Sequence, residues 1–69
     1  MSVIIGGVYE TQSGAFLRLV SQSDLLFNFI LVTKENQPIP EQRNKKGVVV
    51  VRSHRSYSEE VFLSFKKVK

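Results

Sequence analysis

The strongest constraint on the fold of this chain is a period-two alternation of apolar side chains in residues 25–32, LLFNFILV. The odd-numbered positions of this run are all apolar, whereas the even-numbered positions include Asn28. Because successive side chains of a strand point to opposite faces of a sheet, the pattern predicts a strand with one fully buried face. We expect the odd-numbered side chains to lie in the core: Leu25, Phe27, Phe29 and Leu31.

Further runs predict strands by similar reasoning. In residues 15–20 the odd-numbered positions are apolar and share one face, while Arg18 marks the wetter face opposite. Residues 48–51 are all valine, whose branched Cβ restricts χ1 and suits a pleated strand better than a helix. Residues 8–10, VYE, form a short strand near the start of the chain.

Turn-forming residues separate these runs. Gln12-Ser13-Gly14 is expected to lead into the strand at residues 15–20, since Gly14 can adopt positive φ. Residues 21–24, SQSD, are expected to form the next turn, and Gly6-Gly7 a bend. Strand starts about 8 to 12 residues apart, with no helix-length periodic segment between them, favour a small antiparallel barrel or sandwich over a βαβ fold.

The longest segment without a strand signal is a polar loop at residues 33–47, TKENQPIPEQRNKKG. Pro38 and Pro40 disfavour helix and hold the preceding residues extended. Unstructured loops of this length are uncommon in compact domains, and two interpretations stay open: a mobile hairpin tip, and a loop that contacts a partner. Ile39, isolated among polar residues, is expected either to anchor the loop to the core or to offer a small apolar contact.

The C-terminal residues 60–68, EVFLSFKKV, fit two structures. As a strand, the odd-numbered apolar residues face inward; as a helix, the apolar residues share one face, and Ser56 with Glu59 provides a capping box. The strand is slightly favoured because closure of a barrel requires a fifth strand. A short helical turn near residues 56–60 is compatible with it.

The length of 69 residues indicates one small domain, and we assign residues 1–69 to a single β-barrel domain with a long polar loop at residues 33–47. A chain this short buries only about 60% of the surface that its unfolded form exposes, which argues against a deep catalytic cleft within one copy. The absence of Cys excludes thiolate catalysis, Cys-based zinc sites and iron–sulfur clusters. We predict no metal site and no cofactor.

The apolar stretches are too short for a membrane span. The longest, residues 25–32, is interrupted by Asn28, whereas a spanning helix needs about 20 apolar residues. Residues 1–7 carry no Lys or Arg ahead of their short apolar run, so no signal peptide is predicted. We therefore expect a cytoplasmic protein without a membrane partner.

The formal net charge of +4 is unevenly distributed along the chain. Residues 1–33 hold one basic and two acidic residues, a net of −1, whereas residues 34–69 hold nine basic and four acidic residues, a net of +5. A basic surface attracts phosphates and releases counterions, giving an affinity that falls with salt. The excess gathers in three clusters: Arg43/Lys45/Lys46, Arg52/His54/Arg55 and Lys66/Lys67/Lys69.

This charge predicts a nucleic-acid partner, although charges that flank strands also keep small proteins soluble. Basic side chains would contact phosphates, and Tyr57 would stack on unpaired bases, joined by Tyr9 and Phe16 where these face outward. No RNP, KH or helix-turn-helix pattern accompanies the charge. The candidate nucleic-acid-binding residues are Arg43, Lys45, Lys46, Arg52, His54, Arg55 and Tyr57.

No catalytic residue is predicted, and we expect a protein that is not an enzyme. His54 lies next to Ser53, but neighbouring strand side chains point apart and no acid is placed to orient the imidazole. Glu59 and Glu60 are adjacent in sequence, unlike a pair that converges on a shared cleft. No GxGxxG or GxxxxGKS/T motif occurs. An enzyme with a site at an oligomer interface would require His54 and a carboxylate to converge across chains.

The order of strands and turns carries a fold-level resemblance. Gly7-Val8-Tyr9-Glu10, then Gly14, then Arg18-Leu19-Val20, and the tail at residues 60–68 together resemble the SH3-like small barrels of bacteria and their phages. The resemblance implies an all-β, five-stranded, strongly bent antiparallel barrel. That fold hosts nucleic-acid, peptide and structural roles alike, so it implies no functional residue. The segment at residues 33–47 departs from the pattern, since it exceeds a minimal inter-strand turn.

The alternative function is protein interaction, either with an acidic protein surface or as a homo-oligomeric accessory protein of a phage or other mobile element. Its basis is apolar side chains on strand faces opposite the expected core: Phe16, Val20, Leu26, Ile30 and Val32. A small barrel cannot readily hide both faces of its strands. Pairing of strand edges or faces between copies would bury them.

Overall fold

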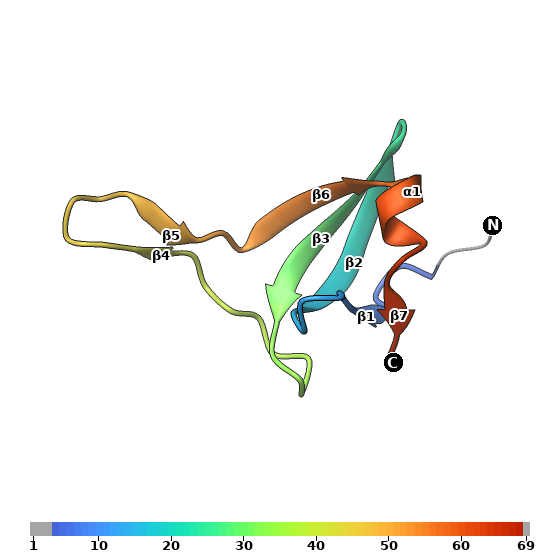
Figure 1. The fold of residues 1–69 in the computed structure, drawn as a ribbon, viewed down its shortest axis with the longest axis horizontal. Helices are drawn as coiled ribbons and strands as arrows, with labels where there is room; N and C mark the ends of the chain where they lie inside the picture. Colours follow the sequence, from blue (N-terminus) through green and yellow to red (C-terminus); the bar gives the residue numbers. More distant parts are fainter. Residues whose placement is uncertain (1–3, 69) are drawn as a thin grey trace.

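The structure of the protein is a computed structural model that describes residues 4–68. Within those residues the chain is mainly β, with one short helix near the C-terminus (Figure 1). In chain order the elements are β1 (Val8–Glu10), β2 (Phe16–Ser23), β3 (Leu26–Val32), β4 (Gln42–Arg43), β5 (Val49–Val51), β6 (His54–Ser58), α1 (Glu59–Phe62) and β7 (Lys66–Lys67).

The main sheet contains five antiparallel strands in the order β6-β3-β2-β1-β7. The two longest strands, β2 and β3, pair from Phe16 opposite Val32 to Ser23 opposite Leu26, with an irregularity between Leu19 and Ser21. β6 and β7 form the two edges, and the sheet is not closed between them. The predicted fold class, a mainly β protein with five antiparallel strands in its main sheet, is confirmed.

The core lies against one face of this sheet and is completed by α1. Leu17 and Leu19 are fully buried there, as predicted, together with the odd-numbered residues of β3 from Phe27 onward. Phe62 of α1 lies among them, with its ring centroid 4.6 Å from that of Phe27 and 4.9 Å from that of Tyr9. The core cluster consists of Tyr9, Leu17, Leu19, Phe27, Phe29, Leu31 and Phe62.

The prediction that Leu25 lies in the core is wrong, because this side chain is 84% exposed. β2 continues through Ser23, so most of the turn predicted at residues 21–24 is strand. The chain reverses at Asp24, whose φ is 50°, and Leu25. Leu25 therefore lies at the hairpin tip, where the alternation that buries the rest of β3 does not apply.

The opposite face of the sheet is covered in part by the segment that follows β3. The Arg18 guanidinium donates from Nε to Asn36 Oδ1 (2.9 Å) and from Nη2 to the Asn36 carbonyl (3.1 Å), which ties this segment to β2. Val32 is 1% exposed, so the expectation that a single copy leaves this side chain uncovered is wrong. Val20 and Leu26, which were also expected to remain uncovered in a single copy, are exposed.

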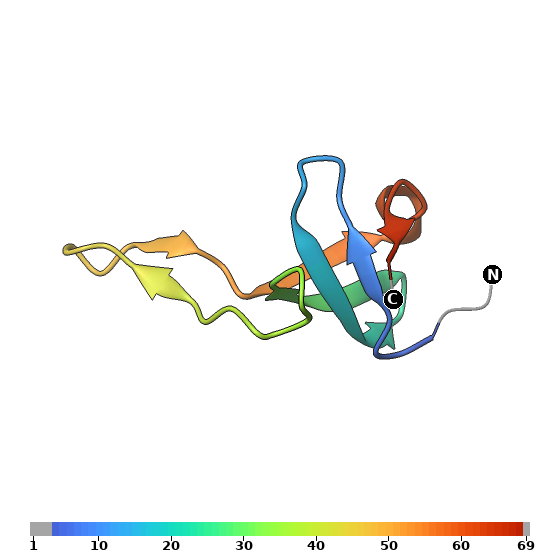
Figure 2. The same cartoon turned by 90° about the horizontal axis from the view of Figure 1, so that it is seen from below.

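Residues 41–52 form a two-stranded hairpin that projects from the sheet, here called the arm (Figures 1 and 2). In the arm, β4 pairs only with β5, and the molecule extends 42 Å along its longest axis. The valines of β5 form a strand, as predicted, but outside the main sheet. The remainder of residues 4–68 is called the body.

The segment predicted as a single polar loop, residues 33–47, is therefore structured. It begins with a turn at Thr33–Asn36, returns alongside β3 through a bridge between Val32 and Pro38, and then enters the arm. Ile39 packs against the core, as does Val51 at the base of β5. Of the two roles considered for Ile39, this contact supports the one in which it anchors the segment to the core.

Three reversals of the chain use the same turn chemistry, at Thr11–Gly14, Thr33–Asn36 and Asn44–Gly47. In each, the fourth residue donates its N–H to the carbonyl of the first and adopts a positive φ, of 89°, 66° and 80° respectively. In each, the side-chain oxygen of the first residue accepts the N–H of the residue after the turn, at 3.1 or 3.2 Å. Thr or Asn followed three residues later by Gly or Asn therefore specifies the turn.

The strand slightly favoured for residues 60–68 is wrong over most of its length. Residues 59–62 form α1, which overlaps the helical turn expected near residues 56–60, and only β7 is extended. The helix begins after Ser58, whose side chain accepts the Val61 N–H at 3.4 Å, so Ser58 and not Ser56 is the cap. A helix prevails because it directs Phe62 into the aromatic core.

Candidate nucleic-acid interface

The net charge of the protein lies entirely on the arm and β6. Residues 41–58 hold five of the ten basic residues and one of the six acidic residues, a net of +4. The rest of the chain therefore holds five of each, a net of zero. The arm and β6 follow one another along the long axis of the molecule (Figure 1), so the charge forms an elongated band.

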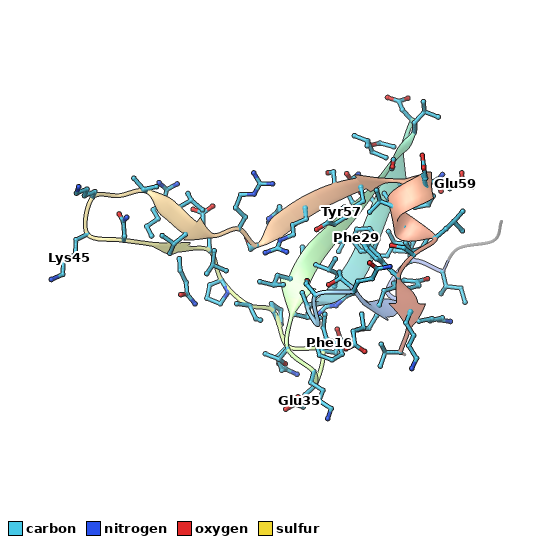
Figure 3. The ribbon with its side chains drawn as sticks, in the orientation of Figure 1. Phe16, Phe29, Glu35, Lys45, Tyr57 and Glu59 are labelled. Atoms are coloured by element: carbon cyan, nitrogen blue, oxygen red, sulfur yellow. The ribbon has the colours of Figure 1, made fainter. Side chains whose placement is uncertain are left out.

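The turn at the end of the arm presents two lysines. Asn44 organises this turn, because its Oδ1 accepts the N–H groups of Lys46 (2.9 Å) and Val48 (3.1 Å). Gly47 closes it with positive φ. Lys45 and Lys46 occupy the two central positions and are exposed, with Lys45 at the far end of the arm in Figure 3.

The Arg43 guanidinium binds mainly to other residues of the arm. Its Nη1 donates to the Gly47 carbonyl at 2.8 Å, and its Nε and Nη2 each lie 3.1 Å from Glu41 Oε2. An exposed ion pair of this kind is worth about 0–1 kcal/mol. Arg43 therefore stabilises the turn that carries the lysines, and Glu41 neutralises its charge.

The predicted residues of β6 lie on two different faces. Arg55 and Tyr57 are half-buried, whereas His54, Ser56 and Ser58 are exposed, in the alternation expected of a strand. His54 is thus on the opposite face from Arg55 and Tyr57. The structure brings Arg55 and Tyr57 together and leaves His54 outside that pair.

The expectation that Ser53 and His54 point apart is wrong. Ser53 precedes β6, so the strand rule does not apply to it, and its Oγ lies 3.3 Å from His54 Nδ1. Within residues 4–68, His54 has no carboxylate partner that would orient its ring. The pair is an exposed polar contact at the base of the arm.

Arg55 and Tyr57 line an open cleft with a volume of about 270 Å³. One wall is the β1–β2 turn, Thr11–Ser13, and the other consists of residues from α1 and the segment after it, among them Phe65. The rings of Tyr57 and Phe65 are almost perpendicular, at 85°, with centroids 5.1 Å apart. Tyr57 also contacts Phe29 of the core, and Figure 3 shows both rings beneath β6.

The other two walls of this cleft were not predicted from the sequence. They come from Thr11–Ser13 and from residues 61–65, two segments that lie more than 40 residues apart in the chain. The only local signal was the Arg-Ser-Tyr spacing, which places Arg55 and Tyr57 on one face of a strand. Phe65 carried no such signal. Its position depends on α1, which the sequence did not predict with the correct bounds.

The two further aromatic residues considered for stacking lie elsewhere. Tyr9 is buried in the core and is not available to a ligand. Phe16 lines a separate hollow of about 490 Å³ together with Glu10, Lys34 and Glu35. Figure 3 shows Phe16 and Glu35 at the bottom of the body, well below Tyr57. The two carboxylates make this hollow a poor site for phosphate.

The third basic cluster is separated from the other two in the sheet. Lys66 and Lys67 form β7, at the edge opposite β6 in the strand order. Lys69, the last member of the cluster, and residues 1–3 lie outside the described residues. The band of charge on the arm and β6 is therefore made by the first two clusters alone.

Comparison of the chain with protein-family models, with curated proteins and with solved structures found no significant match in any of the three. Among residues 4–68, no group of three His, Asp or Glu side chains is arranged to hold a metal ion. Over the same residues, no helix has the length and apolar character needed to cross a membrane.

Proposed function

We propose that this protein is a non-enzymatic module that binds nucleic acid through its arm and β6. The observation that supports this function is the distribution of charge: residues 41–58 carry a net of +4 and the rest of the chain a net of zero. Lys45, Lys46, Arg52 and Arg55 are the proposed phosphate contacts. Arg43 supports them by holding the turn of the arm.

The shape of the arm also supports this function. A two-stranded ribbon is narrow enough to follow a groove or a backbone of nucleic acid. Such a hairpin is only marginally stable by itself, and in this protein only its base packs against the core, through Val51. Phosphates bound along the arm would offset the repulsion among its basic side chains and stabilise it.

The test is a titration of labelled single-stranded and double-stranded oligonucleotides by fluorescence anisotropy at several salt concentrations. Four phosphate contacts on a duplex predict that the logarithm of the affinity falls with the logarithm of the salt concentration with a slope of about −3.6, or roughly −0.9 per contact. In the double variant Lys45→Ala/Lys46→Ala, the slope is expected to shrink by about 1.8.

The matched control is the double variant Lys66→Ala/Lys67→Ala, which removes the same charge from β7 and is expected to leave the slope close to that of the wild type. Equal losses in both double variants would show a response to net charge alone and overturn the role of the arm. Absence of salt-dependent binding at micromolar protein would overturn the function.

We also propose that the body belongs to the class of SH3-like barrels. The support is a strand order in which β1 lies between β2 and β7, so that the first and last strands of the body are neighbours, as in a sheet curled toward closure. The short helix α1 fills the core between β6 and β7. Nuclear Overhauser contacts between the β6 and β7 backbones in solution would establish closure, and their absence would leave an open sheet.

Self-association is a second candidate function, favoured by the apolar side chains on the exposed face of β5. Val50 of β5 is 59% exposed, and Val48, which immediately precedes the strand, is 56% exposed. Within residues 4–68, β5 has no strand on its outer edge. Pairing with a second copy would cover both features. Light scattering across a range of concentrations tests this, and a monomer at the highest concentration would eliminate it.

A further inference from the structure

We propose that the cleft beneath β6 holds one unpaired nucleotide of a bound single strand, with the base against Tyr57 and Phe65 and a phosphate on Arg55. This inference rests on the proposed binding of nucleic acid and deepens it, because it adds the recognition of an unpaired base by the body to the phosphate contacts along the arm and β6. It predicts a preference for single-stranded over double-stranded ligands.

The first support is the hydrogen bonding of Arg55. Within residues 4–68 its guanidinium donates only from Nε, to the Arg52 carbonyl at 3.3 Å. The two terminal nitrogens therefore remain available to a ligand in the cleft. A planar guanidinium presents its N–H groups as a fork that matches two oxygens of a phosphate. Because Arg55 is half-buried, such a contact is less screened than one on the fully exposed arm tip.

The second support is the pair of aromatic rings. Tyr57 and Phe65 are both half-buried, and they stand nearly perpendicular to each other. A flat group that stacks on one ring therefore meets the other ring at its edge. Stacking on aromatic side chains is the usual way in which proteins hold unpaired bases, and it is worth about 1–3 kcal/mol per base. In a duplex these base faces are covered by neighbouring pairs.

The third support is the size and lining of the cleft. Its volume of about 270 Å³ lies just under the range of roughly 300–1,000 Å³ that small-molecule sites occupy, which suits a single nucleotide unit. Among the described residues, Arg55 is the only charged one that lines it. The hydroxyl and amide groups of Thr11, Gln12 and Ser64 lie around it as potential partners for the polar edge of a base.

The fourth support is continuity with the arm. Arg55 contacts the backbone of Arg52, and Arg52 is exposed at the base of the arm. Arg55 and Tyr57 are two positions apart on one face of β6, so their Cα atoms are separated by about 6.6 Å. A strand that follows the arm toward the body thus arrives at Arg55 first and at Tyr57 next.

The inference is tested with three labelled probes of equal length: a thymidine oligonucleotide, an abasic strand with the same phosphates, and a duplex. Anisotropy titrations at one salt concentration are expected to show the thymidine strand bound about tenfold more tightly than the abasic strand. In Tyr57→Leu this preference is expected to disappear while the affinity for the abasic strand is unchanged. Thermal unfolding followed by circular dichroism verifies that this variant is folded at the temperature of the titration.

Arg55→Met and Arg52→Met form a matched pair, since each removes one positive charge at the base of the arm. Arg55→Met is expected to weaken binding of the thymidine strand several-fold more than Arg52→Met does. Both substitutions should weaken binding of the abasic strand to a similar extent. Equal effects of the pair on the thymidine strand would overturn the role of Arg55 in the cleft.

Tyrosine fluorescence tests the stacking with a variant, Tyr57→Phe, that keeps the aromatic ring and its packing. The chain has no Trp and two Tyr residues, so Tyr57→Phe leaves the buried Tyr9 as the only tyrosine emitter. Base stacking is expected to quench the tyrosine emission of the wild type when the thymidine strand binds. The same strand should bind Tyr57→Phe with little change in affinity and without that quenching. Quenching that persists in Tyr57→Phe would overturn the stacking assignment.

The outcomes separate this inference from the function on which it rests. Equal affinity for the thymidine and abasic strands, with weaker binding in Lys45→Ala/Lys46→Ala, would leave the proposed function standing and overturn the inference. Absence of binding to all three probes would overturn both. Displacement of the oligonucleotide by an acidic peptide whose binding itself depends on Tyr57 would assign the cleft to a protein partner and overturn the inference.

Discussion

The body and the arm are built with the same turn but differ in almost every other respect. The body buries residues on both faces of a five-stranded sheet, and apart from β6 it holds four basic and five acidic residues, a net of −1. The arm has one pair of short strands, is exposed along most of its length and carries four basic residues against one acidic residue. The turns at Gly14 and Gly47 are nevertheless nearly identical in hydrogen bonding and φ.

The two regions differ in the pattern of apolar side chains along their strands. In β2 and β3 the apolar side chains alternate, so one face of each strand can join a common core. In the arm, β4 carries polar residues and β5 carries valines on both of its faces, so only Val51 at the base reaches the core. Stability is therefore expected to depend on the body, and charge-dependent binding on the arm.

The largest change in the free energy of unfolding is expected from Phe62→Ala in the body. Truncation of a buried aromatic residue costs about 3–5 kcal/mol, a large part of the roughly 3–10 kcal/mol expected for a domain of this length. Urea unfolding followed by circular dichroism measures the loss. The neighbouring Leu63→Ala, at a residue that is 62% exposed, serves as the control and should change stability by at most about 0.5 kcal/mol.

Replacement of residues 42–50 by Asn-Gly tests whether the arm can be removed from the body. The change keeps Ile39 and Val51, which pack against the core, and removes Arg43, Lys45 and Lys46, so the net charge falls from +4 to +1. We expect a folded protein whose stability changes by about 1 kcal/mol or less. Because Lys45 and Lys46 are the two proposed phosphate contacts removed, the salt slope on a duplex is expected to shrink by about 1.8, roughly 0.9 per contact. Failure to fold would contradict the separation of the two regions.

A matched pair of glycine substitutions compares the two regions directly. Gly14→Ala and Gly47→Ala place a Cβ at φ of 89° and 80° in open space, so each adds about 1–2 kcal/mol of backbone strain and no clash. In the body this strain should lower the free energy of global unfolding. In the arm it should only accelerate amide hydrogen exchange of the hairpin. Equal losses of global stability would show that the arm unfolds together with the body.

The smallest effect is expected at the start of α1. Ser58→Ala removes the side chain that accepts the Val61 N–H, and the long distance of 3.4 Å places the loss near about 0.5 kcal/mol, at the low end for helix caps. Ser58→Asp retains an acceptor and should restore the stability of the wild type. A loss in Ser58→Asp as large as in Ser58→Ala would show that the cap does not stabilise this helix. Thermal unfolding curves of the two variants provide the measurement.

Much of the body could be predicted because its signals are local. Alternation placed Leu17, Leu19 and Phe29 in the core, and Gly14 marked its turn correctly. Leu25 was misplaced because its role depends on where the hairpin reverses, which the alternation does not specify. In the arm, the strand of valines was predicted, but β4 was missed because it has no apolar alternation, although the Asn-x-x-Gly pattern of the turn was present in the sequence.

The candidate site was predictable only in part. The sequence pointed to the basic residues and to Tyr57, and the charge count shows that the excess belongs to the arm and β6. It did not indicate that Arg43 would be held by Glu41 and Gly47, or that His54 would lie on the other face from Arg55. Such distinctions depend on the register of neighbouring strands and on bends between them.

By itself the sequence determined the strand-rich composition, the turns, the buried faces of β2 and β3 and the amount of positive charge, because these follow from the identities and spacing of nearby residues. Only the tertiary structure decided that the valines of β5 leave the main sheet, that Phe62 enters the core from a helix, and that Phe65 meets Tyr57 beside Arg55. The physical reason is the range of the interactions: a strand or a ring finds its partner through contacts between distant segments, which local periodicity does not contain.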